Sequence, residues 1–187
     1  MVQQDDYDLG EHNKEVYAHF GLAFYEANCF EHGLAIALMY ADFLTKAKER
    51  LDQTGIAGFD RPDYEKQFDA FFNDQFSQTM GNLLKRLSAS LPINETLKEN
   101  ITKAKGRRDF LSHHFFREHS VNFVTRAGRD KMIAELEADR ELFRSVDKEL
   151  QEATKPVRQR LGIKDEWLQA HTAKIIERLE RGEPLDF

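Results

Sequence analysis

Residues 11–51, EHNKEVYAHFGLAFYEANCFEHGLAIALMYADFLTKAKERL, contain no proline and place apolar side chains at steps of three and four positions. This spacing matches the period of an α-helix whose apolar stripe faces a core. The side chains that form the stripe are Tyr17, Phe20, Phe24, Ala27, Leu34, Leu38 and Ala41. Because Gly21, Asn28 and Gly33 are weak helix formers, the stretch predicts either one long helix or two nearly collinear helices.

Three more long segments have the same helical periodicity, and no segment shows the alternation of a β-strand. Asp60 and Asn94 suit the N-cap positions of the second and third helices, and Thr125 begins the fourth helix. Pro156 and Gly162 interrupt the chain before a shorter amphipathic helix at its end. The predicted helical ranges are 60–91, 94–119, 125–154 and 163–181.

The composition favours long solvated helices over a sheet, because charged residues make up 32% of the chain and breakers are few, with 10 glycines and 4 prolines. Long amphipathic helices joined by short loops pack as up-and-down bundles. We therefore expect an all-α fold, an antiparallel four-helix bundle with an additional C-terminal helix. The 187 residues suit a single domain, with a core bundle at about 11–154 and a helical extension at 156–181.

Charge and apolar content limit where the protein works. The net charge of −6 disfavours indiscriminate nucleic-acid binding, which needs a broad basic surface, but it allows a local basic patch. The one cysteine, Cys29, excludes an intrachain disulfide and is expected to be buried. Residues 1–10 are acidic, unlike a signal peptide, and the longest apolar run, 33–40, is too short to span a bilayer. These features predict a soluble, cytoplasmic protein without a membrane partner.

The groups able to bind a phosphate and move a proton are concentrated in residues 103–119, KAKGRRDFLSHHFFREH, which we expect to lie on a single helix. On a helical wheel, Arg108 lies on the apolar stripe of this helix, so its charge must be paired or must face a polar cavity. Asp109 and His113 lie on a second face and, four positions apart, are able to touch. A carboxylate beside a histidine favours the imidazolium and fixes its orientation.

The run RRDFLSHHFFREH, set in the penultimate long helix, resembles the motif of the HEPN superfamily, the higher eukaryotes and prokaryotes nucleotide-binding domains. The mark of that superfamily is an arginine, usually followed by Asn, Asp or His, and then a histidine after four to six intervening residues. Arg108, Asp109 and His113 match it, with four residues between the arginine and the histidine. Arg107 and His114 offer a competing pair. The chain is also similar to a family of uncharacterised bacterial helical proteins that carry this motif.

The resemblance implies metal-independent RNA cleavage by a homodimer whose motif helices meet across a two-fold axis, or binding of RNA or a nucleotide without cleavage. It implies that His113 is the acid and base, that Arg108 clamps the phosphate, and that Asp109 orients the histidine or the substrate. No cofactor is implied, and an antitoxin protein is a further expected partner. The residues expected to assist binding are Lys103, Lys105, Arg107, His114 and Arg117.

A histidine and carboxylate metal site is a second hypothesis, because the chain has 7 histidines and many carboxylates. Glu15 and His19 are four positions apart, as are Asp109 and His113, which allows a mononuclear site. Ferritin-like di-iron bundles use Glu-x-x-His pairs on facing helices, and the chain contains none. The resemblance therefore remains the stronger basis for a function, with no metal ligand assigned.

A third hypothesis is a non-catalytic, oligomeric helical bundle that binds other proteins. The acidic net charge suits this class of protein. Here Arg108 simply pairs with a carboxylate at the edge of the core, such as Asp42 or Asp139, and the histidines are ordinary polar surface. Because Arg108 and His113 lie about 140° apart on the helical wheel, the catalytic hypothesis instead needs a bend in the helix or a second subunit to complete the site.

Overall fold

The computed structural model describes residues 7–184, except for the side chain of Phe76, and within that range it is helical without a β-strand. The all-α prediction is therefore confirmed. Among the described residues, no helix combines the length and the apolar character that a membrane crossing requires. Cys29 lies exposed on the first helix, so the expectation that it is buried was wrong.

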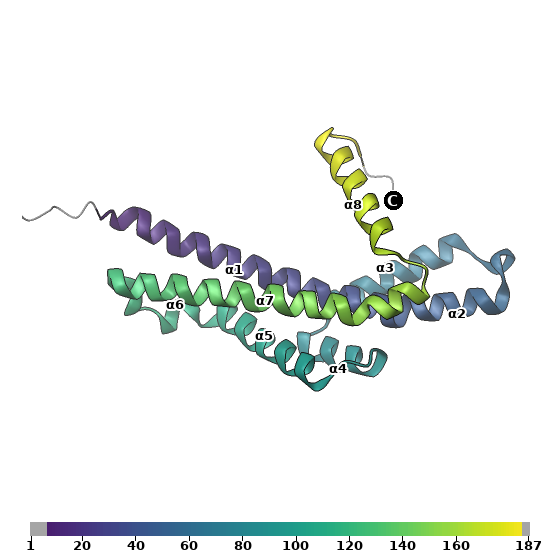
Figure 1. Cartoon of the computed structure of the whole chain (residues 1–187), viewed down its shortest axis with the longest axis horizontal. Coiled ribbons are helices and arrows are strands. Elements are labelled where there is room, and N and C mark those ends of the chain that lie inside the picture. The colour runs from purple at the N-terminus through teal and green to yellow at the C-terminus, as the bar shows by residue number, and fades with distance from the viewer. Residues whose placement is uncertain (1–6, 185–187) are drawn as a thin grey trace, which may run out of the picture.

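The first helical stretch continues from α1 (Leu9–Leu38) through a π-helical segment, η1 (Met39–Leu44), into α2 (Thr45–Thr54) (Figure 1). Asp8 begins the stretch as N-cap and accepts hydrogen bonds from two backbone N–H groups of the first turn. The predicted weak points all lie within regular α1. The irregular turn falls instead at η1, where the Thr45 hydroxyl donates to the Tyr40 carbonyl over 2.9 Å.

The single helix predicted for residues 60–91 is in fact two helices, α3 (Arg61–Ser77) and α4 (Met80–Ser90), so this prediction was wrong. The α3 helix ends because Gln78 takes an extended conformation, with φ −82° and ψ 152°. Thr79 then caps α4, since its side chain accepts a hydrogen bond from the Asn82 backbone. The short η2 (Ile56–Gly58) joins α2 to α3, whose N-cap is Asp60 as predicted.

In the second half of the chain, Asn94 caps its helix as predicted, and the fourth predicted helix begins at Thr125, which is its N-cap. The helix predicted to continue to residue 119 ends at His113, because His114 leaves the helical conformation with φ −130°. The helix after Thr125 continues past Pro156, further than predicted. The elements of this half are α5 (Glu95–His113), α6 (Phe115–Glu118), η3 (Asn122–Val124), α7 (Arg126–Arg160) and α8 (Asp165–Glu180).

The two longest helices, α1 and α7, lie side by side and run in the same direction (Figure 1). Their polar contacts recur at seven-residue steps on both helices, which is the repeat of helices packed at a shallow angle. These contacts join His12 to Asp130, His19 to Glu137 and Glu26 to Arg144. The predicted antiparallel order does not hold for this pair, because the reversal between α3 and α4 adds one change of chain direction.

The α5 helix runs opposite to α7 and packs against both α1 and α7. In its first half, the Asn100 amide donates to both carboxylate oxygens of Glu149. In its second half, Arg107 pairs with Asp139, which lies earlier in α7 than Glu149. The core between these helices and α4 is apolar, and its largest fully buried rings are Phe30, Phe115 and Phe143. This packing fixes the end of α5, which carries the motif, against α1 and α7.

Gly128 lies where α7 begins, buried against the preceding η3 segment. A Cβ atom at this position would overlap the carbonyl oxygen of Asn122, and backbone cannot move aside as a flexible side chain does. Gly128→Ala is therefore expected to lower the free energy of unfolding by about 2–4 kcal/mol. The matched control is Gly21→Ala in α1, where a Cβ meets no atom within 4 Å. This control is expected to stabilise by about 0.5–1 kcal/mol. Urea denaturation measures both, and equal stabilities would contradict the close approach.

Candidate functional site: the end of helix α5

The residues that match the arginine and histidine motif lie on the last two turns of α5, and they face in different directions. Arg107 turns toward α7 and Arg108 toward α1, since each makes its ion pair with that helix. His113 is the last residue of α5 and is exposed, and His114 follows as the C-cap. The structure thus brings the two arginines onto the packed side of the helix and leaves both histidines at its open end.

Arg107 is held by two carboxylates of α7. Its Nε and Nη2 atoms donate to the two oxygens of Asp139 at 2.6 and 2.7 Å, and Nη2 also donates to Glu135 at 2.6 Å. The guanidinium lies 4.5 Å from the centre of the Phe110 ring. Asp139 is buried, and burial raises the pKa of its carboxyl above the usual value despite the opposing effect of Arg107. These contacts make Arg107 part of the α5–α7 packing.

Arg108 is held less tightly. Its Nη2 donates to Oε2 of Glu31 in α1 at 2.9 Å, and Nη1 lies 3.4 Å from Oδ1 of Asp109. The side chain remains 28% exposed. Among the described residues, its buried Nε has no hydrogen-bond partner. The expected pairing of Arg108 with Asp42 or Asp139 does not occur, since Arg107 takes Asp139. The guanidinium therefore keeps donor capacity that Glu31 does not use.

Asp109 faces Lys105 rather than His113. Lys105 donates to Oδ2 of Asp109 at 2.8 Å, one helical turn away. This hydrogen bond, with a further contribution from Arg108, holds the pKa of Asp109 below its usual value. Within the described part of the chain, no hydrogen bond joins Asp109 to His113. The arrangement keeps Asp109 ionised and places it beside Arg108.

The histidines divide into an exposed pair and a packed one. The rings of His113 and His114 are 6.1 Å apart, and Nδ1 of His114 lies 2.8 Å from Nη2 of the exposed Arg117. His119 is largely covered, with its Nε2 3.0 Å from Glu135 and its ring 4.6 Å from that of Phe115. His113, His114 and Arg117 therefore form an accessible group, to which the exposed Lys103 adds positive charge earlier on α5.

Exposed aromatic side chains lie on α1 and on α6, the short helix that follows His113 and His114 in the chain. Tyr17 is 55% exposed, Phe24 36% and Phe116 39%, although large aromatic rings are normally covered. The ring centres of Phe20 in α1 and Phe116 in α6 are 4.7 Å apart, so these two rings pack α1 against α6. We call this surface the aromatic patch, formed by Tyr17, Phe20, Phe24, Phe116 and Phe123. The aromatic patch is exposed apolar surface, and surfaces rich in aromatic side chains are commonly buried in contacts with another protein.

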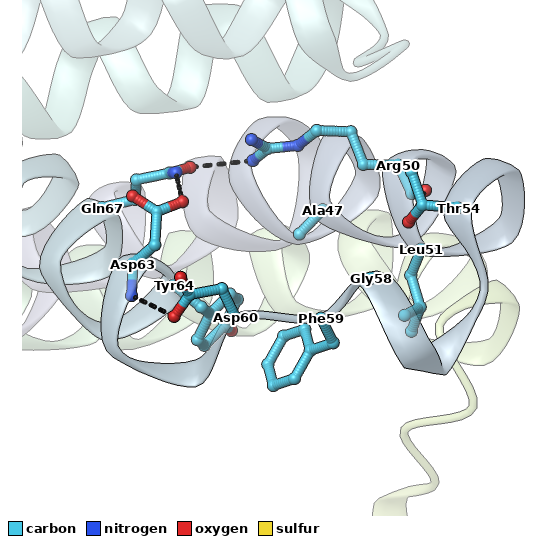
Figure 2. A pocket seen from close by; sticks show the side chains of 10 residues that line it. All are labelled: Ala47, Arg50, Leu51, Thr54, Gly58, Phe59, Asp60, Asp63, Tyr64 and Gln67. Atoms are coloured by element: carbon cyan, nitrogen blue, oxygen red, sulfur yellow. Dashed lines mark hydrogen bonds between the residues drawn. The ribbon is translucent and has the colours of Figure 1, made fainter.

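Two other places are weaker candidates. No group of three or more His, Cys, Asp or Glu side chains among residues 7–184 is arranged to hold a metal ion, and His19 is occupied by Glu137. A cavity of about 180 Å³ lies between α2 and α3, near η2 (Figure 2). Its polar groups are already paired, because Arg50 donates to Gln67 and Gln67 donates to Asp63. The end of α5 remains the stronger candidate.

The sequence identified the region, but it did not identify the carboxylates that hold the two arginines. These are Glu135 and Asp139 for Arg107, and Glu31 for Arg108. Asp139 was predicted as a partner of Arg108, not of Arg107. Consecutive residues of a helix point about 100° apart, so the side chains of Arg107 and Arg108 face different neighbouring helices. Comparisons with models of known protein families, with curated proteins and with solved structures give no match.

The two arginines are expected to differ sharply in their effect on stability. Arg107→Met leaves Asp139 buried without a partner, which costs about 3–5 kcal/mol near neutral pH. Arg108→Met breaks a partly exposed pair and costs about 1 kcal/mol or less. The pKa of the Asp139 carboxyl is raised in the folded protein. The protonated carboxyl therefore contributes stability that is fully present below the pKa of the unfolded chain and is lost as the pH rises through the pKa of the folded protein.

The loss in Arg107→Met is thus expected to shrink as the pH falls and Asp139 takes up a proton. Chemical denaturation of both variants and the parent protein at about pH 7.5 and about pH 4 measures this. A larger loss for Arg108→Met than for Arg107→Met would show that the two roles are reversed.

Proposed function

We propose that the chain is a HEPN-like helical protein that binds RNA and cleaves it as a homodimer, without a metal, with the end of α5 at the subunit groove. The observation that carries this proposal is the exposed imidazole of His113 on the same helix as the partly exposed Arg108, with exposed aromatic rings on α1 and on α6, the helix that follows. A four-helix arrangement like that of the superfamily, a cytoplasmic location and an antitoxin protein as a partner belong to the same proposal.

A second subunit supplies what one chain lacks. Arg108 and His113 lie on different sides of α5, so one helix does not present both groups to one phosphate. If two aromatic patches pack together, the exposed ends of two α5 helices come close, and His113 of one subunit approaches the arginine of the other. A two-fold contact of this kind presents the same surface from both subunits. It also covers the exposed rings of Tyr17, Phe24 and Phe116.

The residues suit cleavage of a phosphodiester by the adjacent ribose hydroxyl. The 2′ oxygen attacks phosphorus and the bond to the 5′ oxygen breaks, which leaves a 2′,3′-cyclic phosphate and a free 5′ hydroxyl. His113 accepts the 2′-hydroxyl proton and, as the imidazolium, donates a proton to the leaving 5′ oxygen. Arg108 donates to the non-bridging oxygens, where charge accumulates in the transition state. Asp109, held by Lys105, keeps the guanidinium of Arg108 in place.

His113→Ala and Arg108→Ala are each expected to reduce the rate of RNA cleavage by about 100-fold or more, because they remove the proton carrier and the phosphate clamp. The assay follows cleavage of a labelled RNA pool in the presence of EDTA, with the products tested for a cyclic phosphate end. Excess EDTA is expected to leave the rate of the parent protein unchanged.

Matched controls for these variants are present in the chain. Arg144 pairs with Glu26 between α7 and α1 as Arg108 pairs with Glu31 between α5 and α1, and His32 is an exposed histidine of α1. Arg144→Ala and His32→Ala are expected to keep the parent rate. Cleavage that survives in both His113→Ala and Arg108→Ala would identify the activity as a contaminant and reject the catalytic proposal.

Glu31 competes with RNA for the guanidinium of Arg108, and its removal should favour the phosphate. Glu31→Gln is expected to tighten RNA binding by roughly 3- to 10-fold at low salt, because a negative charge beside the phosphate is lost. Glu26→Gln, which frees Arg144 and changes the net charge equally, is the control and should have little effect. Fluorescence anisotropy with a labelled RNA measures both affinities. Weaker binding by Glu31→Gln than by Glu26→Gln would contradict a role for Arg108 in phosphate binding.

A second candidate function is a non-catalytic, oligomeric protein that binds other proteins through the aromatic patch. The observation that favours it is the pairing of both motif arginines with carboxylates of neighbouring helices. In that case the patch associates as described, but the parent protein neither binds nor cleaves RNA. The two assays above separate the candidates, since only the RNA-binding protein responds to Glu31→Gln.

A further inference from the structure

The C-terminal helix α8 extends away from the body that the other helices form (Figure 1). None of its residues is buried. Three apolar side chains and one threonine follow steps of four, three and four positions, and we call this row the α8 stripe, formed by Leu168, Thr172, Ile175 and Leu179. Leu179 is 53% exposed. A helix of this length is stabilised mainly by packing its apolar face. In the extended position, the α8 stripe lacks such packing over most of its length.

A second uncovered row lies on α1, on the side turned away from the core. Its members also follow steps of four and three positions, and Leu22 is 45% exposed, Tyr25 65% and Ile36 43%. This is the spacing of a helix that packs lengthwise against another helix. We call this row the outer stripe, formed by Ala18, Leu22, Tyr25, Cys29, His32 and Ile36, all of them exposed.

The two stripes already approach each other at one end. Leu168, near the base of α8, lines a cavity of about 200 Å³ together with Ile36 and Tyr40. The chain turns between α7 and α8, and α7 runs parallel to α1, so an α8 folded back onto the body runs antiparallel to α1. Closing this cavity with Leu168 against Ile36, the exposed residue of α1 that lines it, defines a register for the two stripes.

From that first contact, each further member of the α8 stripe falls opposite a member of the outer stripe. Thr172 lies four residues after Leu168 on α8, and His32 lies four residues before Ile36 on α1, so these two polar side chains face each other in one layer. Three residues further, Ile175 meets Cys29, and a last step of four residues sets Leu179 against Tyr25. Matched steps over three turns of helix are what a continuous antiparallel seam requires.

The sides of the two helices agree with this register. In an antiparallel pair, corresponding flanks of the two stripes lie next to each other. On α1, the flank that carries Glu26 faces α7, because Glu26 pairs with Arg144. On α8, the corresponding flank carries Gln169 and Ile176, which line a cavity with Gln151 of α7. Both flanks thus turn toward α7, and α8 needs no rotation about its own axis to close.

The turn before α8 suits a pivot. Gly162 has φ +78°, a conformation that favours glycine, and the backbone of Ile163 donates to the Arg158 carbonyl at 2.9 Å. Asp165, the first residue of α8, accepts from Arg158 at 2.7 Å. Because this ion pair lies at the base of the helix, it is able to persist while the far end of α8 moves.

We propose that α8 closes onto the outer stripe of α1 in its own chain, pivoting at residues 161–164, with Leu168 against Ile36 as the first contact. The closed helix covers Cys29 and Tyr25, which lie exposed in the extended form. On the helical wheel of α1, the centre of the outer stripe is turned by roughly 120° from Phe24, so the two surfaces lie on different faces of the helix. Closure of α8 is therefore independent of the proposed RNA chemistry.

Cys29 makes the register testable, because it is the one cysteine of the chain. In the closed form it faces residue 175, within the distance that a disulfide bridges. Full-length Ile175→Cys is expected to form a disulfide within one chain under mild oxidation, in most of the molecules. The control Ala173→Cys, on the opposite face of α8, is expected to form at least about tenfold less. Mass spectrometry and electrophoresis without reductant measure the products.

Two outcomes of this experiment would overturn the proposal. One is an Ile175→Cys protein that forms no more disulfide than Ala173→Cys. The other is a disulfide of Ile175→Cys that joins two chains, since it would assign the outer stripe to α8 of a second copy. Variants of Arg108 and His113 are expected to leave the crosslink unchanged, so failure of the RNA assays and failure of this test are distinguishable.

The reactivity of Cys29 in the parent protein gives a second measurement. Closure shields the thiol, so its reaction with a soluble disulfide reagent is expected to be slow. Ile175→Glu/Leu179→Glu places charge on the α8 stripe and is expected to raise the rate by about tenfold or more. The control Ala170→Glu/Ala173→Glu adds the same charge on the opposite, exposed face and should keep the parent rate. Equal rates in the parent protein and both variants would reject closure.

Discussion

The buried carboxylate of Asp139 is the constraint on which the end of α5 depends. An ionised carboxylate in an apolar core is tolerated only when hydrogen-bonding cations surround it, and Arg107 meets that need with two donors. Glu135, which also accepts from Arg107, lies 3.0 Å from Nε2 of His119. Once Arg107 is committed to α7, the rotation of the helix leaves Arg108 to face α1 and leaves the exposed histidines at the open end. A structural ion pair thus determines where the chemical groups lie.

The parallel packing of α1 and α7 has a similar consequence for the whole molecule. Polar contacts at seven-residue steps hold the two helices in one register over most of α1. Both helices therefore begin at the same end, near α6 (Figure 1). Aromatic rings of α1 contact Phe116 of α6. The opposite end receives α8, which can return only antiparallel to both helices. The motif and the pivot of α8 are separated along the molecule for this reason.

Local signals in the sequence predicted local features well. Asp60, Asn94 and Thr125 begin helices because a cap needs only a side-chain oxygen and the next three residues. The break at Gln78 was missed because apolar side chains keep a helical spacing across it, although Thr79 is itself a good cap. The pairing of Arg107 and Arg108 depends on which helices become neighbours, and α5 alone does not carry that information. The candidate site was therefore located by its motif, while its ion pairs were not.

The difference between the two arginines bears directly on whether a phosphate can be bound. Arg107 makes three short contacts and lies on an aromatic ring, so a ligand would have to displace a buried carboxylate to reach it. Arg108 makes one contact of 2.9 Å and one of 3.4 Å, and Glu31 is itself partly exposed. Exchanging that carboxylate for a phosphate oxygen replaces one charge-assisted hydrogen bond by another, at little cost in desolvation. Of the two competing arginines, Arg108 is therefore the one whose guanidinium is able to change partners.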